Sequence, residues 1–201
     1  MQSLQGHLLI ASPHLGDPNF ARSVVLMVEH QREGALGLVL NHPSPQTIAN
    51  IWAELSGKSS DRTDFIYVGG PIEGPLMAIH TTAPMGESEI VPGLWFATHR
   101  DHINTLVESA ETPFRLFSGY SGWSAGQLEA EMEAGGWITR QASKEDDEKE
   151  AGGWLTLSAS AEFVFSTEDD ELWHMVVRRV GGEILRADRH IRRLPDDPSL
   201  N

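Results

Sequence analysis

The chain has 201 residues, no cysteine and a formal net charge of −14. A chain of this length can bury the core of one domain without a disulfide or metal staple, and the lack of thiols excludes disulfides, thiol catalysis and cysteine-ligated metals. The negative charge disfavours binding to the phosphate backbone of nucleic acids. Because no signal-peptide pattern and no apolar run of about 20 residues is present, we expect a cytoplasmic protein with no membrane partner.

Hydrophobic runs predict the strands. Residues 23–30 are apolar on both faces as far as Val28, so we expect this strand to be covered on both sides. After a turn at 31–34, residues 35–40 return as a second buried strand, and the two strands make a central hairpin. The remaining predicted strands are 6–11, 65–68, 76–81, 94–97, 137–139, 154–157 and 162–165.

Capping residues and the helical spacing of apolar residues predict the helices. A single helical turn should begin at Asp17, and a short amphipathic helix covers 47–55. Thr98 caps the next predicted helix, 98–109. The last helix begins at 166–167, and one of its faces carries the apolar residues Trp173, Val176, Val177 and Val180.

Residues 115–129 are the stretch around which the chain is organised. They predict a short buried strand at 116–117, a glycine-rich turn from Gly119 to Gly126, and a helix from about 125 to 134. Ser124 and Gln127 have the spacing of a capping box at the start of that helix. Strands and helices are mixed along the whole chain without a regular alternation, which favours an α+β fold with a mixed or largely antiparallel sheet.

A series of short blocks carries a family resemblance. The blocks are 6–11, 17–25, 29–30, 34–37, 41–43, 68–71, 119–120, 123, 126–129 and 172–173. In residues and order they resemble the AlgH/YqgE family of bacterial proteins. The resemblance implies a single α+β domain over 1–188, whose sheet curls into a barrel-like shape with flanking helices. It also implies a poorly characterised protein that has been described as a transcriptional regulator.

Two segments stand apart from this domain. Relative to a typical family member, 136–152 has the character of an inserted acidic loop, and residues 189–201 should form a flexible C-terminal tail. A function carried by the inserted loop would be specific to this protein and not shared by the family.

Polar residues between 17 and 41 flank the predicted hairpin. They either line a pocket for a small anion or a partner's tail, or are structural, with an Arg22–Asp17 pair anchoring the loop. Two glycine stretches, 69–70 and 119–126, either approach a ligand through their backbone or make tight turns at sheet corners. The candidate binding residues are therefore Asp17, Arg22, His30, Asn41, Gly69, Gly70, Tyr120, Trp123 and Gln127.

Catalytic motifs have competing structural interpretations. Residues 122–126 match G-x-S-x-G, so Ser124 is a candidate nucleophile of a serine hydrolase, although the simpler interpretation is that Ser124 is a helix N-cap. His99 and His102 lie one helical turn apart, but no third ligand is specified, so we expect no metal site. No phosphate loop or dinucleotide motif is present, and we expect no cofactor.

The leading hypothesis is a non-catalytic cytoplasmic binding or regulatory protein whose partner is an unidentified protein or small ligand. Whether the protein is an enzyme is left open, with a serine hydrolase that uses Ser124 as one alternative. A second alternative is nucleic-acid binding through the C-terminal arginines, which the net charge of −14 disfavours. These arginines are Arg178, Arg179, Arg186, Arg189, Arg192 and Arg193.

Overall fold

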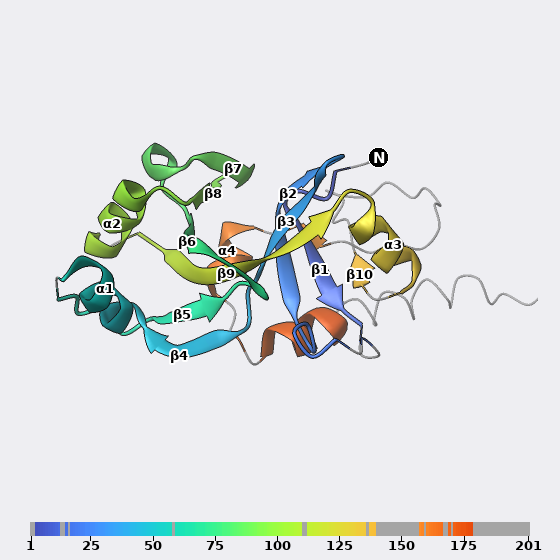
Figure 1. The fold of residues 1–201 in the computed structure, drawn as a ribbon, viewed down its shortest axis with the longest axis horizontal. Coiled ribbons are helices and arrows are strands. Elements are labelled where there is room, and N and C mark those ends of the chain that lie inside the picture. Colours follow the sequence, from blue (N-terminus) through green and yellow to red (C-terminus); the bar gives the residue numbers. More distant parts are fainter. Residues whose placement is uncertain are drawn as a thin grey trace, which may run out of the picture.

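A computed structural model of the chain describes residues 3–12, 15, 17–57, 59–109, 112–135, 137–139, 157–158, 160–166, 169 and 171–178 (Figure 1). The strands are β1 (His7–Ala11), β2 (Val24–Gln31), β3 (Gly34–Val39), β4 (Pro43–Thr47), β5 (Phe65–Val68), β6 (Ile72–His80), β7 (Ser88–Val91), β8 (Leu94–Ala97), β9 (Phe114–Ser124), β10 (Trp137–Thr139) and β11 (Leu157–Ser158). The helices are α1 (Ile48–Ser56), the 3-10 turn η1 (Ala83–Met85), α2 (Arg100–Glu108), α3 (Gln127–Glu133) and α4 (Ala161–Ser166).

The strands join in the order β10-β1-β2-β3-β9-β6-β8-β7, with β11 beside β1 and with β5 between β4 and β9. The described pairings are antiparallel except for that of β5 with β9, which is parallel. The sheet curls into a half-barrel. One half of it holds β1 to β3 and β10 with α3, and the other holds β4 to β8 with α1 and α2 (Figure 1). This arrangement confirms the expected α+β domain with a curled, mixed sheet.

The central hairpin of β2 and β3 forms as the hydrophobic pattern predicts. Val25 pairs with Val39 and Leu26 with Leu38, and the first five residues of β2 are buried. Successive side chains of a strand point to opposite faces, so Leu26 packs into one hydrophobic cluster and Val25 into another. Both faces of β2 are therefore covered, as the sequence predicts.

β9 is a single long strand that ends at Ser124, so the predicted glycine-rich turn at 119–126 is wrong except at residues 125–126. Its first half pairs with β5 and β6, and its second half pairs with β3. Gly119 has a φ of 72°, and a Cβ there would lie 2.8 Å from the carbonyl oxygen of Gly70 and 2.9 Å from that of Ile72. Glycine thus lets β9 pass close to its neighbour rather than reverse direction. α3 consequently begins at Gln127, with Gly126 rather than Ser124 as its N-cap.

Helices α1 and α2 differ in how their N-termini are capped. Thr47 caps α1 and accepts a hydrogen bond from the amide of Asn50, within one residue of the predicted helix. The predicted Thr98 cap of α2 is wrong, because the N-cap is His99 and its side chain makes no capping bond. The carboxylate of Glu87 instead accepts hydrogen bonds from the amides of Thr98 and His99.

The predicted strand at 162–165 is wrong, because these residues belong to α4. Ser160 explains the change. Its hydroxyl accepts a hydrogen bond from the amide of Phe163, and its carbonyl accepts one from that of Val164. A serine hydroxyl at this position offers the backbone a helical start. β4 and β7 are strands that the hydrophobic pattern does not indicate.

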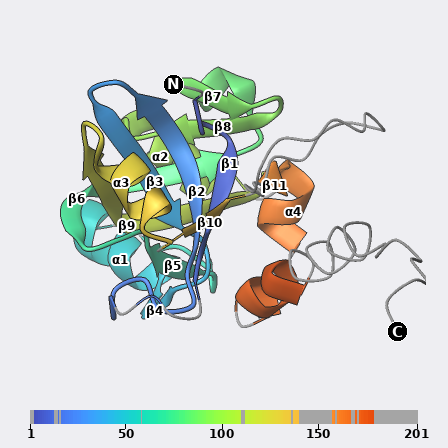
Figure 2. The ribbon, with the colours of Figure 1, turned by 90° about the vertical axis from the view of Figure 1, so that its right-hand side faces the viewer.

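Helical residues 171–178 pack along the same side of the sheet as α4 (Figure 2). Leu172, Trp173 and Val176 are buried in the cluster that contains Leu8 of β1, which confirms the described part of the predicted apolar face. The indole Nε1 of Trp173 donates a hydrogen bond of 3.0 Å to the carbonyl oxygen of Ala11. The predictions for Val180, for residues 140–152 of the insertion and for the tail at 189–201 lie outside the described residues.

A polar clamp made by Tyr67, Arg115 and Asp169 joins the start of this last helical region to the sheet. The Tyr67 hydroxyl donates a hydrogen bond of 2.8 Å to one carboxylate oxygen of Asp169, and Arg115 lies 3.2 Å from the other. The guanidinium of Arg115 also stacks over the Tyr67 ring, 4.7 Å from its centroid. Burial raises the pKa of Tyr67 to about 12, so its hydroxyl keeps the proton that it donates. None of the described helices has the length and apolar character needed to cross a membrane.

Candidate ligand pocket

A pocket of about 680 Å³ opens where the loop between β1 and β2 meets β9, α3 and β10. The loop contributes Phe20, β9 contributes Trp123, α3 contributes Glu131, and β10 contributes Trp137. The other lining residues are Leu15, Asp17, Pro71, Ile72, Gly122, Gln127, Ala134 and Gly135. The curl of the sheet brings segments more than 100 residues apart to one place.

Three aromatic rings form one side of the pocket. Phe20 packs edge-on against Trp137, with 5.1 Å between the ring centroids and 73° between the planes. Trp123 meets Trp137 in a similar T-shaped contact at 6.1 Å, and Phe20 stacks obliquely on Trp123 at 6.3 Å. Such edge-to-face contacts hold rings in defined orientations. The wall is therefore rigid and apolar.

The carboxylate of Glu131 lies between the two indoles. One of its oxygens accepts hydrogen bonds of 2.9 Å from the Nε1 atoms of both Trp123 and Trp137. Its other oxygen accepts a hydrogen bond of 3.0 Å from the side-chain amide of Gln127. The sequence reasoning missed Glu131. A signal was available, because Glu131 follows Gln127 by four residues and so shares its face of the helix.

A second hollow of about 550 Å³ adjoins the pocket. Both are lined by Ile72, Gly122 and Trp123, so they share a wall. The charged residues of the second hollow are Glu29 and Glu33, and it also contains Tyr120, Ser124, Gln31, Gly34, Ala35 and Leu36. The two hollows form a continuous surface along the second half of β9.

The structure divides the predicted binding residues into two groups. Asp17, Trp123 and Gln127 line the pocket, and Tyr120 lines the second hollow. The other five line neither of them, and they are Arg22, His30, Asn41, Gly69 and Gly70.

Asn41 and Arg22 have structural contacts at the end of the hairpin. Asn41 accepts a hydrogen bond from the amide of Val24 and donates one to the carbonyl oxygen of Arg22, both of 2.9 Å. Arg22 has a φ of 56°, and this bond holds its unusual backbone in place. Asp17 accepts a hydrogen bond from the amide of Asn19 rather than pairing with Arg22. The segment at 17–20 is a turn without a helix.

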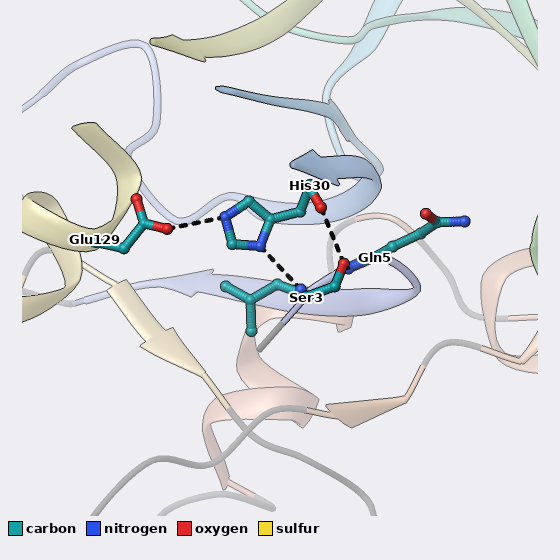
Figure 3. Close-up of polar contacts among 5 residues, drawn as sticks. Ser3, Gln5, His30 and Glu129 are labelled. Carbon is teal, nitrogen blue, oxygen red and sulfur yellow. Dashed lines mark hydrogen bonds and ion pairs between the residues drawn. The ribbon is translucent and has the colours of Figure 1, made fainter. Parts of the chain in front are cut away.

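His30 connects the N-terminal segment to α3 (Figure 3). Its Nδ1 accepts a hydrogen bond of 2.9 Å from the amide of Leu4, and its Nε2 lies 3.1 Å from a carboxylate oxygen of Glu129. Because Nδ1 is an acceptor, a neutral His30 carries its proton on Nε2 and donates it to Glu129. Ser3 adds a hydrogen bond to the carbonyl oxygen of His30. Both ring nitrogens are thus engaged within the protein.

The two glycine stretches face each other. A Cβ on Gly69 would lie 2.4 Å from the carbonyl oxygen of Gly119, and one on Gly70 would lie 2.3 Å from the carbonyl carbon of Tyr120. Gly69 also accepts a hydrogen bond of 3.1 Å from the buried hydroxyl of Ser121. These glycines therefore allow close contact between backbones of the sheet, which is the structural alternative foreseen for them.

Ser124 lies at the exposed end of β9 rather than on a nucleophile elbow. Its hydroxyl donates a hydrogen bond of 3.0 Å to the side-chain oxygen of Gln127, which also accepts one from the Ser124 amide. A nucleophile elbow needs a strained backbone, yet among the described residues Arg22 is the one non-glycine residue with a positive φ. The hydrolase alternative has no support in this geometry.

The remaining sequence-level candidates give no site in the described residues. No group of three histidine, aspartate or glutamate side chains there could hold a metal ion. His102 lies 3.4 Å from the carboxylate of Glu87, and the ring of His99 packs beside it. Of the arginine cluster, only Arg178 falls within the described part of the chain, where it is exposed.

The curled mixed sheet, with helices at both of its ends, defines a half-barrel α+β protein. Residues 8–147 match the family model DUF179, described as AlgH-like, and the chain belongs to this family. A UPF0301 protein of Chlorobaculum tepidum is 34% identical, over 98% of this chain and 95% of its own. One of Streptomyces coelicolor is also 34% identical, over 100% and 97%.

Solved structures support the same assignment. The solution structure of AlgH from Pseudomonas aeruginosa is 30% identical, with a TM-score of 0.69 over 90% of each chain. The crystal structure of a Corynebacterium diphtheriae protein has a TM-score of 0.64 over 89% of this chain and 87% of its own. Its identity is 22%, so the likeness concerns the fold alone.

Proposed function

We propose that the protein is a non-catalytic binding or regulatory protein of the cytoplasm, and that its ligand enters the pocket beside Glu131. The observation that carries this proposal is the fixed carboxylate between two indoles, at the side of a pocket of about 680 Å³. Small-molecule sites combine apolar walls with a few polar groups held in place, and their volumes are typically about 300–1,000 Å³. Three of the predicted binding residues line this same pocket.

The contacts around the pocket favour binding over catalysis. Covalent catalysis needs a nucleophile within reach of a base that is free to accept its proton. Ser124 donates to Gln127, and both nitrogens of His30 are engaged away from the pocket. The side chains of Gln127 and Glu131 are hydrogen-bonded to each other, so both are held in fixed positions from which they can orient a ligand.

A thermal-shift screen with a blocked variant tests this proposal. Ala134 is exposed and lines the pocket, so Ala134→Trp places a bulky side chain in its mouth. Ala130 is also exposed and lies one turn earlier on α3 but does not line the pocket, which makes Ala130→Trp the matched control. The screen should contain amines, guanidines, phosphate esters, nucleotides, divalent metals and short DNA and RNA.

A ligand that binds only the folded state stabilises it by about 2.7 kcal/mol at a concentration 100 times its Kd. We expect a compound that raises the Tm of the native protein and of Ala130→Trp but not that of Ala134→Trp. The fluorescence of Trp123 and Trp137 should change with the same ligand, since both indoles line the pocket. A hit that survives Ala134→Trp, or no hit in any class, would contradict the proposal.

A further inference from the structure

We infer that the ligand of this pocket is a small organic cation, bound through an ammonium or guanidinium group. The inference rests on the proposed function, because it assigns a ligand class to the same pocket. It differs from the sequence-based hypothesis that the polar residues near the hairpin bind a small anion. Arg22, the cation on which an anion site would depend, does not line the pocket.

The charged residues that line the pocket in the described part of the chain are all negative. Asp17 and Glu131 line the pocket itself, and Glu29 and Glu33 line the adjoining hollow. Among the described residues, neither lining contains a lysine or an arginine. The formal net charge of −14 adds to this local field. A concave surface with one sign of charge concentrates ligands of the opposite sign and repels phosphates and carboxylates.

The charges of Asp17 and Glu131 are not neutralised by a cation of the described chain. No ion pair of either residue occurs within the described ranges. Glu131 is hydrogen-bonded by two indoles and one amide, all of them neutral donors. These donors hold the carboxylate in position and leave its charge in place, so a bound cation would supply the missing counter-charge.

The aromatic wall suits a cation better than a neutral polar group. The faces of aromatic rings carry negative potential, and ammonium and guanidinium groups are attracted to them, most strongly to tryptophan. Phe20, Trp123 and Trp137 meet beside the carboxylate of Glu131. Because Trp123 and Trp137 are nearly buried, the partly exposed ring of Phe20 supplies most of the aromatic contact with a ligand. The volume of about 680 Å³ fits a small molecule.

Calorimetric titration with charged probes and their neutral isosteres tests the inference. Nα-acetylarginine amide is compared with Nα-acetylcitrulline amide, and choline with 3,3-dimethylbutan-1-ol, so that each pair differs mainly in charge. We expect at least one cation to bind at least tenfold more tightly than its neutral partner. Its affinity should fall as salt is added, because salt screens exposed charges. Ala134→Trp should abolish the binding, and Ala130→Trp should leave it unchanged.

Removal of one pocket charge gives an independent measurement. Asp17→Asn keeps the acceptor for the Asn19 amide, so the loop should be preserved. It should weaken binding of the cation by about threefold to tenfold, the order expected for one solvent-exposed charge pair, because Asp17 is exposed. Glu54→Gln removes an equal charge from an exposed position on α1, at the other end of the molecule, and should have no effect (Figure 1).

The outcomes separate the inference from the proposed function. If Nα-acetylcitrulline amide or inorganic phosphate binds as tightly as Nα-acetylarginine amide, and Ala134→Trp abolishes that binding, the cation class is overturned and the pocket is kept. Binding of a cation equally to Asp17→Asn and Glu54→Gln would also overturn it. If none of these probes binds, but a compound of another chemical class in the thermal-shift screen binds in the pocket, the cation inference fails and the proposed function stands. If every probe that binds the native protein binds Ala134→Trp with the same affinity, both the cation inference and the proposed function are contradicted.

Discussion

Gly119 and Gly126 form a natural pair for testing how the sheet is held together. Their φ angles are 72° and 74°, both in the left-handed region, so an alanine at either position incurs backbone strain of about 1–2 kcal/mol. Part of that strain is offset, by about 0.4–1 kcal/mol, because alanine restricts the unfolded chain. The surroundings differ. A Cβ on Gly126 meets nothing within 4 Å, whereas one on Gly119 lies 2.8 and 2.9 Å from two backbone oxygens.

The magnitude of the difference follows from these contacts. Backbone oxygens of a paired strand cannot rotate away as a side chain can, and overpacking of this kind costs about 1–3 kcal/mol. We therefore expect Gly126→Ala to lower the free energy of unfolding by about 1 kcal/mol and Gly119→Ala by about 3 kcal/mol. With a urea m-value of about 2 kcal/mol/M, the two midpoints should differ by about 1 M.

Urea unfolding followed by tryptophan fluorescence measures both variants under one condition. Equal midpoints for the two variants would refute the reasoning, because they would show that the backbone strain alone matters. That result would mean that β9 does not need its close contact with the carbonyls of Gly70 and Ile72.

Other substitutions test single contacts. Glu131→Ala should lower the free energy of unfolding by about 2–4 kcal/mol, because the nearly buried indoles of Trp123 and Trp137 lose their acceptor, and urea unfolding would detect it. Thr47→Ala should cost about 1 kcal/mol through the lost cap of α1, and an unchanged urea midpoint would contradict that role. Burial lowers the pKa of His80 below its ordinary 6.5, so below that pH the unfolded chain binds a proton that the native state resists. Stability should therefore fall as pH decreases from 7.5 to 5.5, and His80→Asn should flatten this dependence of Tm; an equal slope in the variant would exclude His80 as its source.

The hairpin of β2 and β3 was predictable because its hydrophobic pattern and its turn agree. β9 was not, because its glycines have the same local signature whether they reverse the chain or allow another backbone to approach. That distinction depends on Gly70, which lies far away in the sequence. β4 was missed for a related reason. It contains Pro43 and Pro45, which argue against a strand unless it has a free edge.

The pocket was predictable only in part. Trp123 and Gln127 belong to the central stretch, and their proximity follows from local spacing. Trp137 and Phe20 join them only through the pairing of β10 with β1 and through the turn before β2. The prediction for His30 found a residue with important contacts, but its partners Leu4 and Glu129 make it a connection within the fold. Polarity alone cannot distinguish such a residue from one that contacts a ligand.

The position of β1 has a consequence for synthesis of the chain. One edge of β1 pairs with β2, which is synthesised soon after it. The other edge pairs with β10 and β11, and the carbonyl of Ala11 accepts a hydrogen bond from Trp173, so these contacts form only after much more of the chain has been synthesised. A nascent chain therefore carries an open strand edge until most of its residues have left the ribosome. Open edges pair readily with other chains. Premature termination before β10 would leave a polypeptide prone to aggregation, and light scattering of a chain ending at residue 135, beside the full-length protein, measures that hazard.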